Sequence, residues 1–222
     1  VFIGYPPDTN KILPPGVMAG APSLGGMFGS APQFVGECNP YTVTAPASHW
    51  TPSDEIIQEI RHGEGMVLYP YDDSKGPATR RFTSYQGFFK TGQYSPRNED
   101  LGYATIGVGH LIKVHETSKY PANVEITEAA AMALFKKDLI SHAKPIAQHV
   151  KVPISQGQYD ALASFIYNVG SGNFRKSQVL ALLNAGDCAG AAGAFMNHTK
   201  SRGKELAGLV RRRTREAQRF VG

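Results

Sequence analysis

Cysteine is scarce in this sequence, which has only two among its 222 residues. Two cysteines are too few for a disulfide framework, and the separation of Cys38 and Cys188 does not fit a metal-ligand motif. Either they pair, which would tie the N-terminal part of the chain to the rest, or they remain free thiols. The sequence leaves both alternatives open.

Long apolar runs are also missing. No stretch of about 18 apolar residues occurs, which excludes a membrane-spanning helix. The chain starts at Val1 rather than methionine, and no basic segment followed by an apolar one opens it. We therefore expect a mature product or a fragment of a longer protein, without a secretory signal of its own.

Several catalytic motifs are absent as well. His110 and His115 lie five residues apart and the sequence has no HExxH pattern, which argues against a zinc enzyme such as a metallo-amidase. There is no Gly-x-Ser-x-Gly element of a serine hydrolase and no glycine-rich loop that would cradle a phosphate. The sequence therefore predicts chemistry without a metal or another cofactor.

Residues 1–50 differ in composition from the rest of the chain. They contain eight of the 15 prolines and seven of the 24 glycines, few charges, and neither helical nor alternating periodicity. A segment of this kind seldom builds a core of its own. We expect an irregular Pro/Gly-rich arm or interdomain linker over 1–50, followed by one globular domain over 51–222.

Positive charge is concentrated at the other end of the chain. Residues 200–222 hold eight Lys and Arg against Glu205 and Glu216, an excess of six where the whole chain has a net charge of +5. One interpretation is a solvated helical face with i,i+4 pairing, and the other is attraction to a polyanion. Because the sequence has no nucleic-acid recognition pattern, and no aromatic residues alternate with these arginines, specific nucleic-acid binding is not expected.

Helix and strand signals predict an α+β fold for the globular part. Thr51, Pro52 and Asp54 signal a helix start, and this helix is predicted over 52–62, ending at Gly63. Residues 66–110, which are rich in glycine, proline, tyrosine and threonine, predict a small and mostly β lobe.

Later segments follow helical patterns and predict a larger helical lobe. One helix is expected over 127–143, stopped by Pro145. The next is opened by a capping box of Ser155 and Gln158 and ends before Gly170. Three further helices are predicted over 176–184, 187–198 and 208–221.

Two carboxyl groups near the first helix indicate acid/base chemistry. Glu64 follows Ile56 and Ile60 by eight and four residues, so it shares their apolar face and should be poorly solvated, which favours its protonated form. Asp73 lies in a loop of turn formers and should stay hydrated and ionised. One acid to protonate a leaving oxygen and one carboxylate to activate water are what glycoside hydrolysis requires.

At these positions the sequence resembles a known family. Glu64-Gly65, Tyr71, Asp73 and the block Thr105-Ile106-Gly107-Val108-Gly109-His110 are similar to the active-site signature of the phage-type lysozymes, glycoside hydrolase family 24. Further blocks are similar in the same order, namely 134–139, 156–162, 165–170 and 208–213. The resemblance covers about residues 54–221 and implies a lysozyme-like fold, with a cleft between the small β lobe and the larger helical lobe.

The resemblance also implies a function. A member of this family would be a peptidoglycan hydrolase, a lysozyme or muramidase, that cleaves the β-1,4 bond between N-acetylmuramic acid and N-acetylglucosamine. Glu64 would be the general acid, Asp73 the base that activates water, and Thr105 a residue that helps to hold that water. The family inverts the sugar in a single displacement, for which the carboxyl groups stand about 6.5–9.5 Å apart. Related groups without the aspartate are lytic transglycosylases, so Asp73 favours hydrolysis over that alternative.

Four more residues join the candidate site through the same resemblance. Tyr71 and Asn168 are candidate substrate contacts, with core packing as the alternative for both. His110 is expected beside the site, ion-paired rather than catalytic. A C-terminal arginine can pair with the catalytic glutamate in this family; we include Arg211, and the sequence leaves the choice open among Arg211, Arg212 and Arg213.

One departure from the family pattern concerns the spacing between Asp73 and Thr105. Here 31 residues separate them, whereas the family usually has only a handful. The extra segment, about 77–101, contains two arginines and several aromatic residues: Arg80, Arg81, Phe82, Tyr85, Phe88, Phe89 and Tyr94. It is either a surface hairpin whose aromatic side chains pack on the β lobe, or a flap that stacks on sugar rings and meets carboxylates through its arginines.

Other functions and settings remain open from the sequence. The chain would be a wall-binding module without activity, or a polyanion-binding protein, if the carboxyl groups do not act. As an enzyme it would bind peptidoglycan glycan strands in the bacterial periplasm or cell wall. It would be the bacteriolytic domain of a phage lysin or of an interbacterial effector, delivered by a phage or a secretion system. Other domains of a longer chain, or an immunity protein, are further expected partners.

Overall fold

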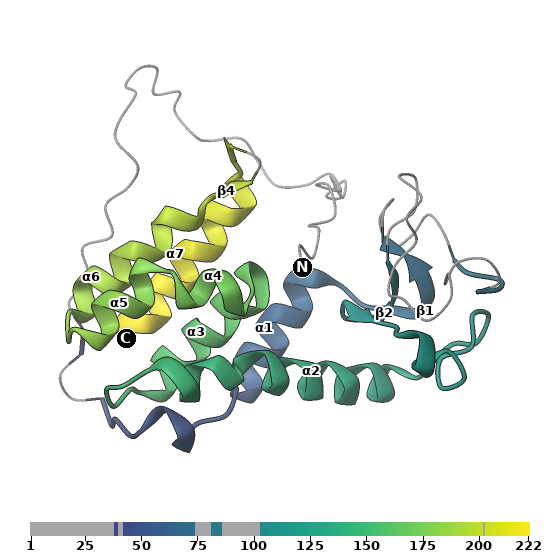
Figure 1. Ribbon diagram of the computed structural model, residues 1–222, viewed down its shortest axis with the longest axis horizontal. Coiled ribbons are helices and arrows are strands. Elements are labelled where there is room, and N and C mark those ends of the chain that lie inside the picture. The colour runs from purple at the N-terminus through teal and green to yellow at the C-terminus, as the bar shows by residue number, and fades with distance from the viewer. Residues whose placement is uncertain (1–37, 40–41, 74–80, 86–102, 202) are drawn as a thin grey trace, which may run out of the picture.

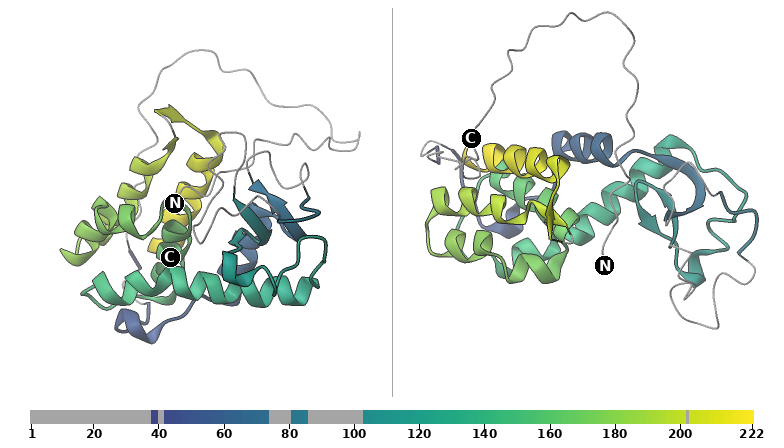
Figure 2. Two further views of the ribbon diagram at one scale, coloured as in Figure 1. Left: turned by 45° about the vertical axis from the view of Figure 1, so that its right-hand side comes forward. Right: turned by 90° about the horizontal axis from the view of Figure 1, so that it is seen from above.

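A small sheet and a larger group of helices lie at opposite ends of a long helix (Figure 1). The computed structural model describes residues 38–39, 42–73, 81–85, 103–201 and 203–222. Within these ranges the long helix, α2 (Glu128–His149), extends from the helical group to the sheet, and the two turned views show the same separation (Figure 2). The predicted α+β class, with a small β lobe and a larger helical lobe, is confirmed.

Helix α1 (Asp54–Glu64) connects the two lobes. Its N-cap is Ser53, whose hydroxyl accepts a hydrogen bond from the Ile56 amide at 3.2 Å. The predicted end at Gly63 is wrong, because Gly63 stays helical and Gly65 takes the positive φ of +77° that terminates the helix. Glu64 is therefore the last residue of α1 rather than part of a loop.

The β lobe is a three-stranded antiparallel sheet with the order β1-β2-β3. Strand β1 (Val67–Asp72) pairs with β2 (Ala104–Gly107), which turns into the short β3 (His110–Leu111). In this register Tyr71 lies opposite Thr105. The mostly β character predicted for 66–110 is confirmed for the part of that range that the structure describes.

The described part of the extra segment, 81–85, packs on this lobe. Arg81 forms an isolated β-bridge with Tyr71 and pairs with Glu125 at 2.8 Å. Phe82 is buried, and the Tyr85 hydroxyl donates to the Tyr120 carbonyl at 2.7 Å. These contacts match the hairpin alternative for the residues concerned. Arg80, Phe88, Phe89 and Tyr94 lie outside the described residues, so a flap there stays a prediction.

The helical lobe surrounds α3 (Gln156–Val169), which has nine consecutive buried residues from Tyr159 to Tyr167. The predicted capping box is confirmed, since Ser155 and Gln158 exchange side-chain and backbone hydrogen bonds. Short elements not predicted from the sequence are the helix α4 (Ser171–Arg175), the 3-10 helices η1 (Ala47–His49) and η3 (Val114–Glu116), and the strands β4 (Lys200–Ser201) and β5 (Lys204–Glu205). The 3-10 helix η4 (Phe195–His198) forms the end of the segment predicted as a helix over 187–198. The remaining helices are α5 (Gln178–Asn184), α6 (Cys188–Ala194) and α7 (Ala207–Val221).

Pro145 does not stop α2, so that prediction is wrong. The helix continues to His149 with Pro145 inside it. The proline removes the amide that would bond to the Ser141 carbonyl, but Ser141 is exposed and water can take that role. Beyond the proline, Ile146 is fully buried in the helical core, and this packing keeps the chain helical.

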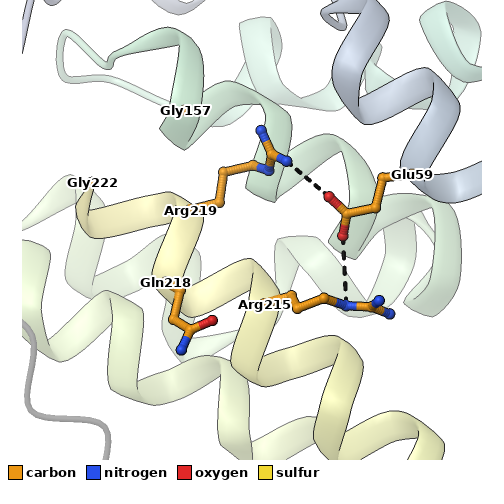
Figure 3. A pocket seen from close by; sticks show the side chains of 6 residues that line it. All are labelled: Glu59, Gly157, Arg215, Gln218, Arg219 and Gly222. Carbon is orange, nitrogen blue, oxygen red and sulfur yellow. Dashed lines mark hydrogen bonds and ion pairs between the residues drawn. The ribbon is translucent and has the colours of Figure 1, made fainter.

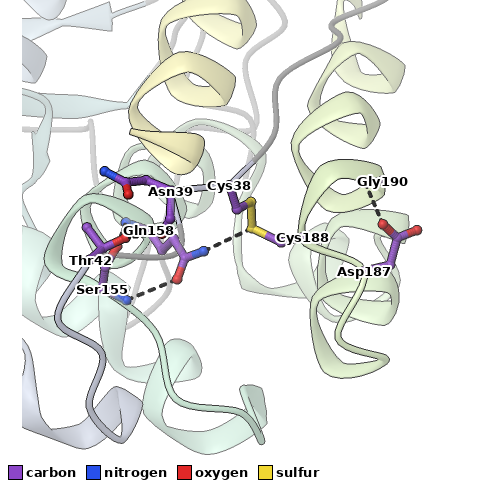
Figure 4. Close-up of a disulfide and its surroundings, with 8 residues drawn as sticks. All are labelled: Cys38, Asn39, Thr42, Ser155, Gln158, Asp187, Cys188 and Gly190. Carbon is purple, nitrogen blue, oxygen red and sulfur yellow. Dashed lines mark hydrogen bonds between the residues drawn. A yellow bond between two sulfur atoms is a disulfide. The ribbon is translucent and has the colours of Figure 1, made fainter.

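A strap of residues before α1 is fixed to the helical lobe. Cys38 and Cys188 form a disulfide, with Cα atoms 6.1 Å apart, which settles the question left open by the sequence (Figure 4). The Asn39 amide donates to the Val221 carbonyl at 2.9 Å, and Ala45 pairs with Ile154. The packed body therefore includes residues before Thr51, while 1–37 lie outside the described residues.

Replacing Cys188 with serine should lower the free energy of unfolding by about 2–5 kcal/mol, because the disulfide closes a long loop in the unfolded chain. Urea denaturation of the oxidised protein measures the loss. Cys38→Ser should cost the same amount, and the double variant no more than either single one. Equal stability of the oxidised wild type and the serine variants would contradict a stabilising role.

Candidate active site

Contacts on two faces of helix α1, one apolar and one charged, fix the position of Glu64 at its end. Ile56, Ile57 and Ile60 belong to a small core that also contains Phe135 from α2 and Tyr167 from α3. On the charged side, Glu59 pairs with Arg219 at 2.8 Å and with Arg215 at 3.6 Å (Figure 3). Because both faces are engaged, the end of α1 has a defined position.

The carboxyl group of Glu64 contacts a guanidinium group from α7. Arg212 Nη1 lies 2.7 Å from Glu64 Oε1, and the two side chains are 8% and 14% exposed. The expectation that water is scarce around Glu64 is confirmed, but its surroundings include this cation as well as apolar side chains. Arg211, the arginine included in the site from the sequence, is exposed, and Arg212 makes the contact with Glu64.

Asp73 follows β1 and is held by the backbone of Tyr103. The Tyr103 amide donates to Asp73 Oδ1 at 2.5 Å, and the Asp73 amide donates to the Tyr103 carbonyl at 3.1 Å. Burial raises the pKa of Asp73, as does the charge of Asp72, whereas hydrogen bonds from Tyr103 and Thr105 lower it. The carboxyl group is half-buried, which corrects the expectation of a freely hydrated loop aspartate.

Thr105 on β2 has a hydroxyl group with two acceptors in reach. Its Oγ1 lies 3.2 Å from the Tyr103 carbonyl oxygen and is also placed to donate to Asp73. A hydroxyl has one proton, so it can serve only one of them at a time, and its lone pairs remain available to a third partner. Thr105 and Asp73 thus form one polar unit.

Tyr71 lies near both carboxyl groups, those of Glu64 and Asp73. It is buried and lies opposite Thr105 in the sheet. Burial raises the pKa of its phenol, and the negative charges of Asp73 and Glu64 raise it further. Both carboxylates therefore lie close enough to Tyr71 to act on it, which places α1, β1 and β2 around one site.

His110 and Asn168 are engaged with protein groups. His110 Nδ1 lies 2.7 Å from Asp138 Oδ2, and its Nε2 lies 3.6 Å from Glu116, so the predicted ion pairing of His110 is observed. Asn168 Oδ1 accepts a hydrogen bond from Arg213 at 3.2 Å. Neither geometry tests a substrate contact, and those assignments stay predictions.

A cavity of about 610 Å³ lies between the turn after β2 and the helical lobe. It extends from the turn at Gly109 and His110, past Asp138 on α2, to the junction of α3 and α4 around Gly170. Tyr167 and His110 are among its lining residues, whereas Glu64, Asp73 and Thr105 are not.

The described ranges contain neither a metal-binding cluster nor a membrane-spanning helix. No group of three or more His, Cys, Asp or Glu side chains there has a geometry that would hold a metal ion. None of the helices in those ranges is long and apolar enough to span a membrane.

Sequence reasoning missed the contribution of Tyr103 and the choice of Arg212. Tyr103 acts on Asp73 through its backbone, which no side-chain pattern reveals. Arg212 had a signal, because it lies on the buried face of α7 together with Leu209, Arg213, Glu216, Ala217 and Phe220. These residues recur at helical spacing, and Arg211 does not fall on that face.

Comparison with known proteins gives a consistent result. Residues 83–216 match the family model described as phage lysozyme. The SAR-endolysin of Bacteriophage PS119 is 40% identical over 129 residues, which cover 58% of this chain and 73% of that protein. The endolysin of Salmonella phage P22 is 40% identical over 124 residues, 56% of this chain and 84% of that protein. The match to the endolysin of Bacillus phage B103 covers 43% of that protein's length.

Solved structures show the same fold. A mutant of P22 lysozyme aligns with a TM-score of 0.59 and 30% identity over 78% of this chain and 99% of that one. The muramidase domain of SpmX from Asticaccaulis excentricus aligns with a TM-score of 0.56 and 27% identity, over 77% of this chain and 97% of that one. The lysozyme-like fold predicted from the sequence is confirmed.

Gly109→Ala should lower the free energy of unfolding by about 1–2 kcal/mol, the cost of a left-handed conformation for a residue with a Cβ atom. Gly109 has φ +78°, and an added methyl group would stand 3.2 Å from the Tyr167 hydroxyl. The control is Gly172→Ala in α4, where the methyl group meets no atom within 4 Å. Denaturation curves that coincide for the two variants would contradict this account of the turn.

Proposed function

This chain belongs to the phage lysozyme family, a family of peptidoglycan hydrolases, and on that premise we propose that Glu64 and Asp73 cleave the glycan strand by acid/base catalysis. The proposed bond is the β-1,4 link between N-acetylmuramic acid and N-acetylglucosamine. The observation that carries the proposal is the convergence of Glu64, Asp73 and Thr105 around Tyr71.

In the proposed mechanism, Asp73 and Thr105 hold a water molecule on one side of the sugar ring. Asp73 takes a proton from this water as its oxygen attacks the anomeric carbon, and Glu64 gives a proton to the departing glycosidic oxygen. One water is added across the bond, and the sugar inverts because attack and departure occur on opposite faces. Arg212 is bonded to Oε1 of Glu64, and a proton on Oε2 is compatible with that bond.

The coarse setting follows from the family, and the finer one is a proposal. The substrate is peptidoglycan. We infer that the chain acts as the bacteriolytic domain of a phage lysin, because the curated relatives described above are phage endolysins. An interbacterial effector with its immunity protein is the alternative setting, which the SpmX muramidase domain leaves open as an example outside phages.

Glu64→Gln should reduce clearing of purified peptidoglycan by about a hundredfold or more, because the general acid is lost while the fold is kept. The matched control is Glu59→Gln, five residues earlier on α1. This variant also removes a carboxylate that is paired with an arginine, but it should retain activity. Mass analysis of wild-type fragments should show products with one added water. Anhydro-sugar products would indicate a transglycosylase, cleaved amide bonds an amidase, and an active Glu64→Gln enzyme would remove Glu64 from the acid role.

Thr105→Val should move the acidic limb of the activity profile to higher pH. Asp73 works as a base only when ionised, and its pKa is raised by burial and held down by the Tyr103 amide and the Thr105 hydroxyl. Removing that hydroxyl raises the pKa further, so activity is lost at a higher pH as the solution is acidified. Thr105→Ser keeps the hydroxyl and should keep the limb in place. A limb that is the same in wild type and Thr105→Val would contradict the assignment of Asp73.

A further inference from the structure

Helix α7 buries three charged residues close together, which requires an explanation. Arg213, Glu216 and Arg212 are 0%, 3% and 7% exposed. Burial of charges is costly unless each has a partner, and apolar residues of similar size would usually fill such a site as well or better. The arrangement of these charges therefore points to a purpose other than packing.

We propose that Glu216 is a positioning residue, a fixed counter-ion that holds Arg212 against Glu64 whether or not Glu64 is protonated. The inference rests on the proposed role of Glu64 as the general acid. It assigns a function to a carboxylate that does not itself touch the substrate.

Glu216 is anchored from the side of the helical core. Its Oε1 accepts a hydrogen bond from Ser164 Oγ of α3 at 2.6 Å and another from Arg213 Nη2 at 3.0 Å. Its Oε2 lies 2.9 Å from Arg213 Nε. Arg213 is in turn fixed by Asn168 at 3.2 Å and by the face of Phe165, whose ring centre lies 4.8 Å from the guanidinium carbon. This end of the network has little freedom to move.

Arg212 connects this anchored end to the active site. Its Nε lies 3.4 Å from Glu216 Oε1, and its Nη1 lies 2.7 Å from Glu64 Oε1. One guanidinium group thus spans the permanent carboxylate on α7 and the catalytic carboxyl on α1. When Glu64 takes up the proton that it must deliver, Arg212 still has an anion beside it and need not leave its place.

The charge balance of the cluster supports this role. Burial raises the pKa of Glu216, and the guanidinium groups of Arg213 and Arg212 and the Ser164 hydroxyl offset only part of that rise. The carboxylate form is supported by the geometry, since three guanidinium nitrogens lie within 3.4 Å of its oxygens. His198 of η4 also faces the cluster, and burial together with the charge of Arg213 lowers its pKa, which disfavours a third cation there. Both arginines therefore contact Glu216, and Arg212 contacts Glu64 as well.

Glu216→Gln tests the proposal, since it keeps the shape and removes the charge. Turnover of purified peptidoglycan should fall about tenfold, and the alkaline limb of the pH profile should move to lower pH by about one pH unit. The limb moves because Arg212, without Glu216, is left to stabilise the ionised form of Glu64. Ser164→Ala is the matched control: it removes a hydrogen bond to the same oxygen, keeps every charge, and should lower stability without moving the limb.

Two further variants keep the test decisive. Glu216→Asp retains the charge on a shorter side chain, so turnover should fall several-fold while the alkaline limb stays in place, and this holds even if the glutamine variant does not fold. In an Arg212→Met background, Glu216→Gln should produce no additional shift. Wild-type turnover in Glu216→Asp, or an unmoved limb in a folded Glu216→Gln, would overturn the positioning role. An active Glu64→Gln enzyme would instead overturn the proposed function itself.

Discussion

The ion pair between Glu64 and Arg212 is the contact on which the arrangement of the site depends. It joins the last residue of α1 to the buried face of α7, although the two residues are 148 positions apart in the chain. A carboxyl group at the end of a helix would otherwise be free to turn toward water. Here its position is determined by a guanidinium group that is itself packed inside the protein.

The two lobes contribute different parts of the proposed chemistry. The helical lobe supplies Arg212 and, behind it, the buried charges that hold it. The sheet supplies Asp73, whose carboxylate is oriented by the backbone of Tyr103 across the β1–β2 pair. The small core of Ile56, Ile57, Ile60 and their neighbours packs α1 against α2 and α3 and so holds the helix that ends in Glu64.

The sequence was most informative where local signals decide the structure. The capping box at Ser155 and Gln158 and the apolar period of α3 need no knowledge of the rest of the molecule. Pro145 shows the limit of such signals, because burial of Ile146 in a core built from distant helices outweighs the local penalty. The disulfide and the partner of Glu64 are contacts between remote segments, and neither composition nor spacing determines which residues meet. The helical spacing of the buried residues in α7 would have selected Arg212, whereas the run of three arginines alone does not show which one faces inward.

The hydrogen bond between Asn39 and Val221 brings two remote points of the chain to one place. Together with the bond from Cys38 to α6, it places the first described residues beside the end of α7, at the pole of the molecule opposite the sheet (Figures 1 and 4). Both contacts lie on the helical lobe, so breaking them would loosen that lobe without touching the sheet that carries Asp73.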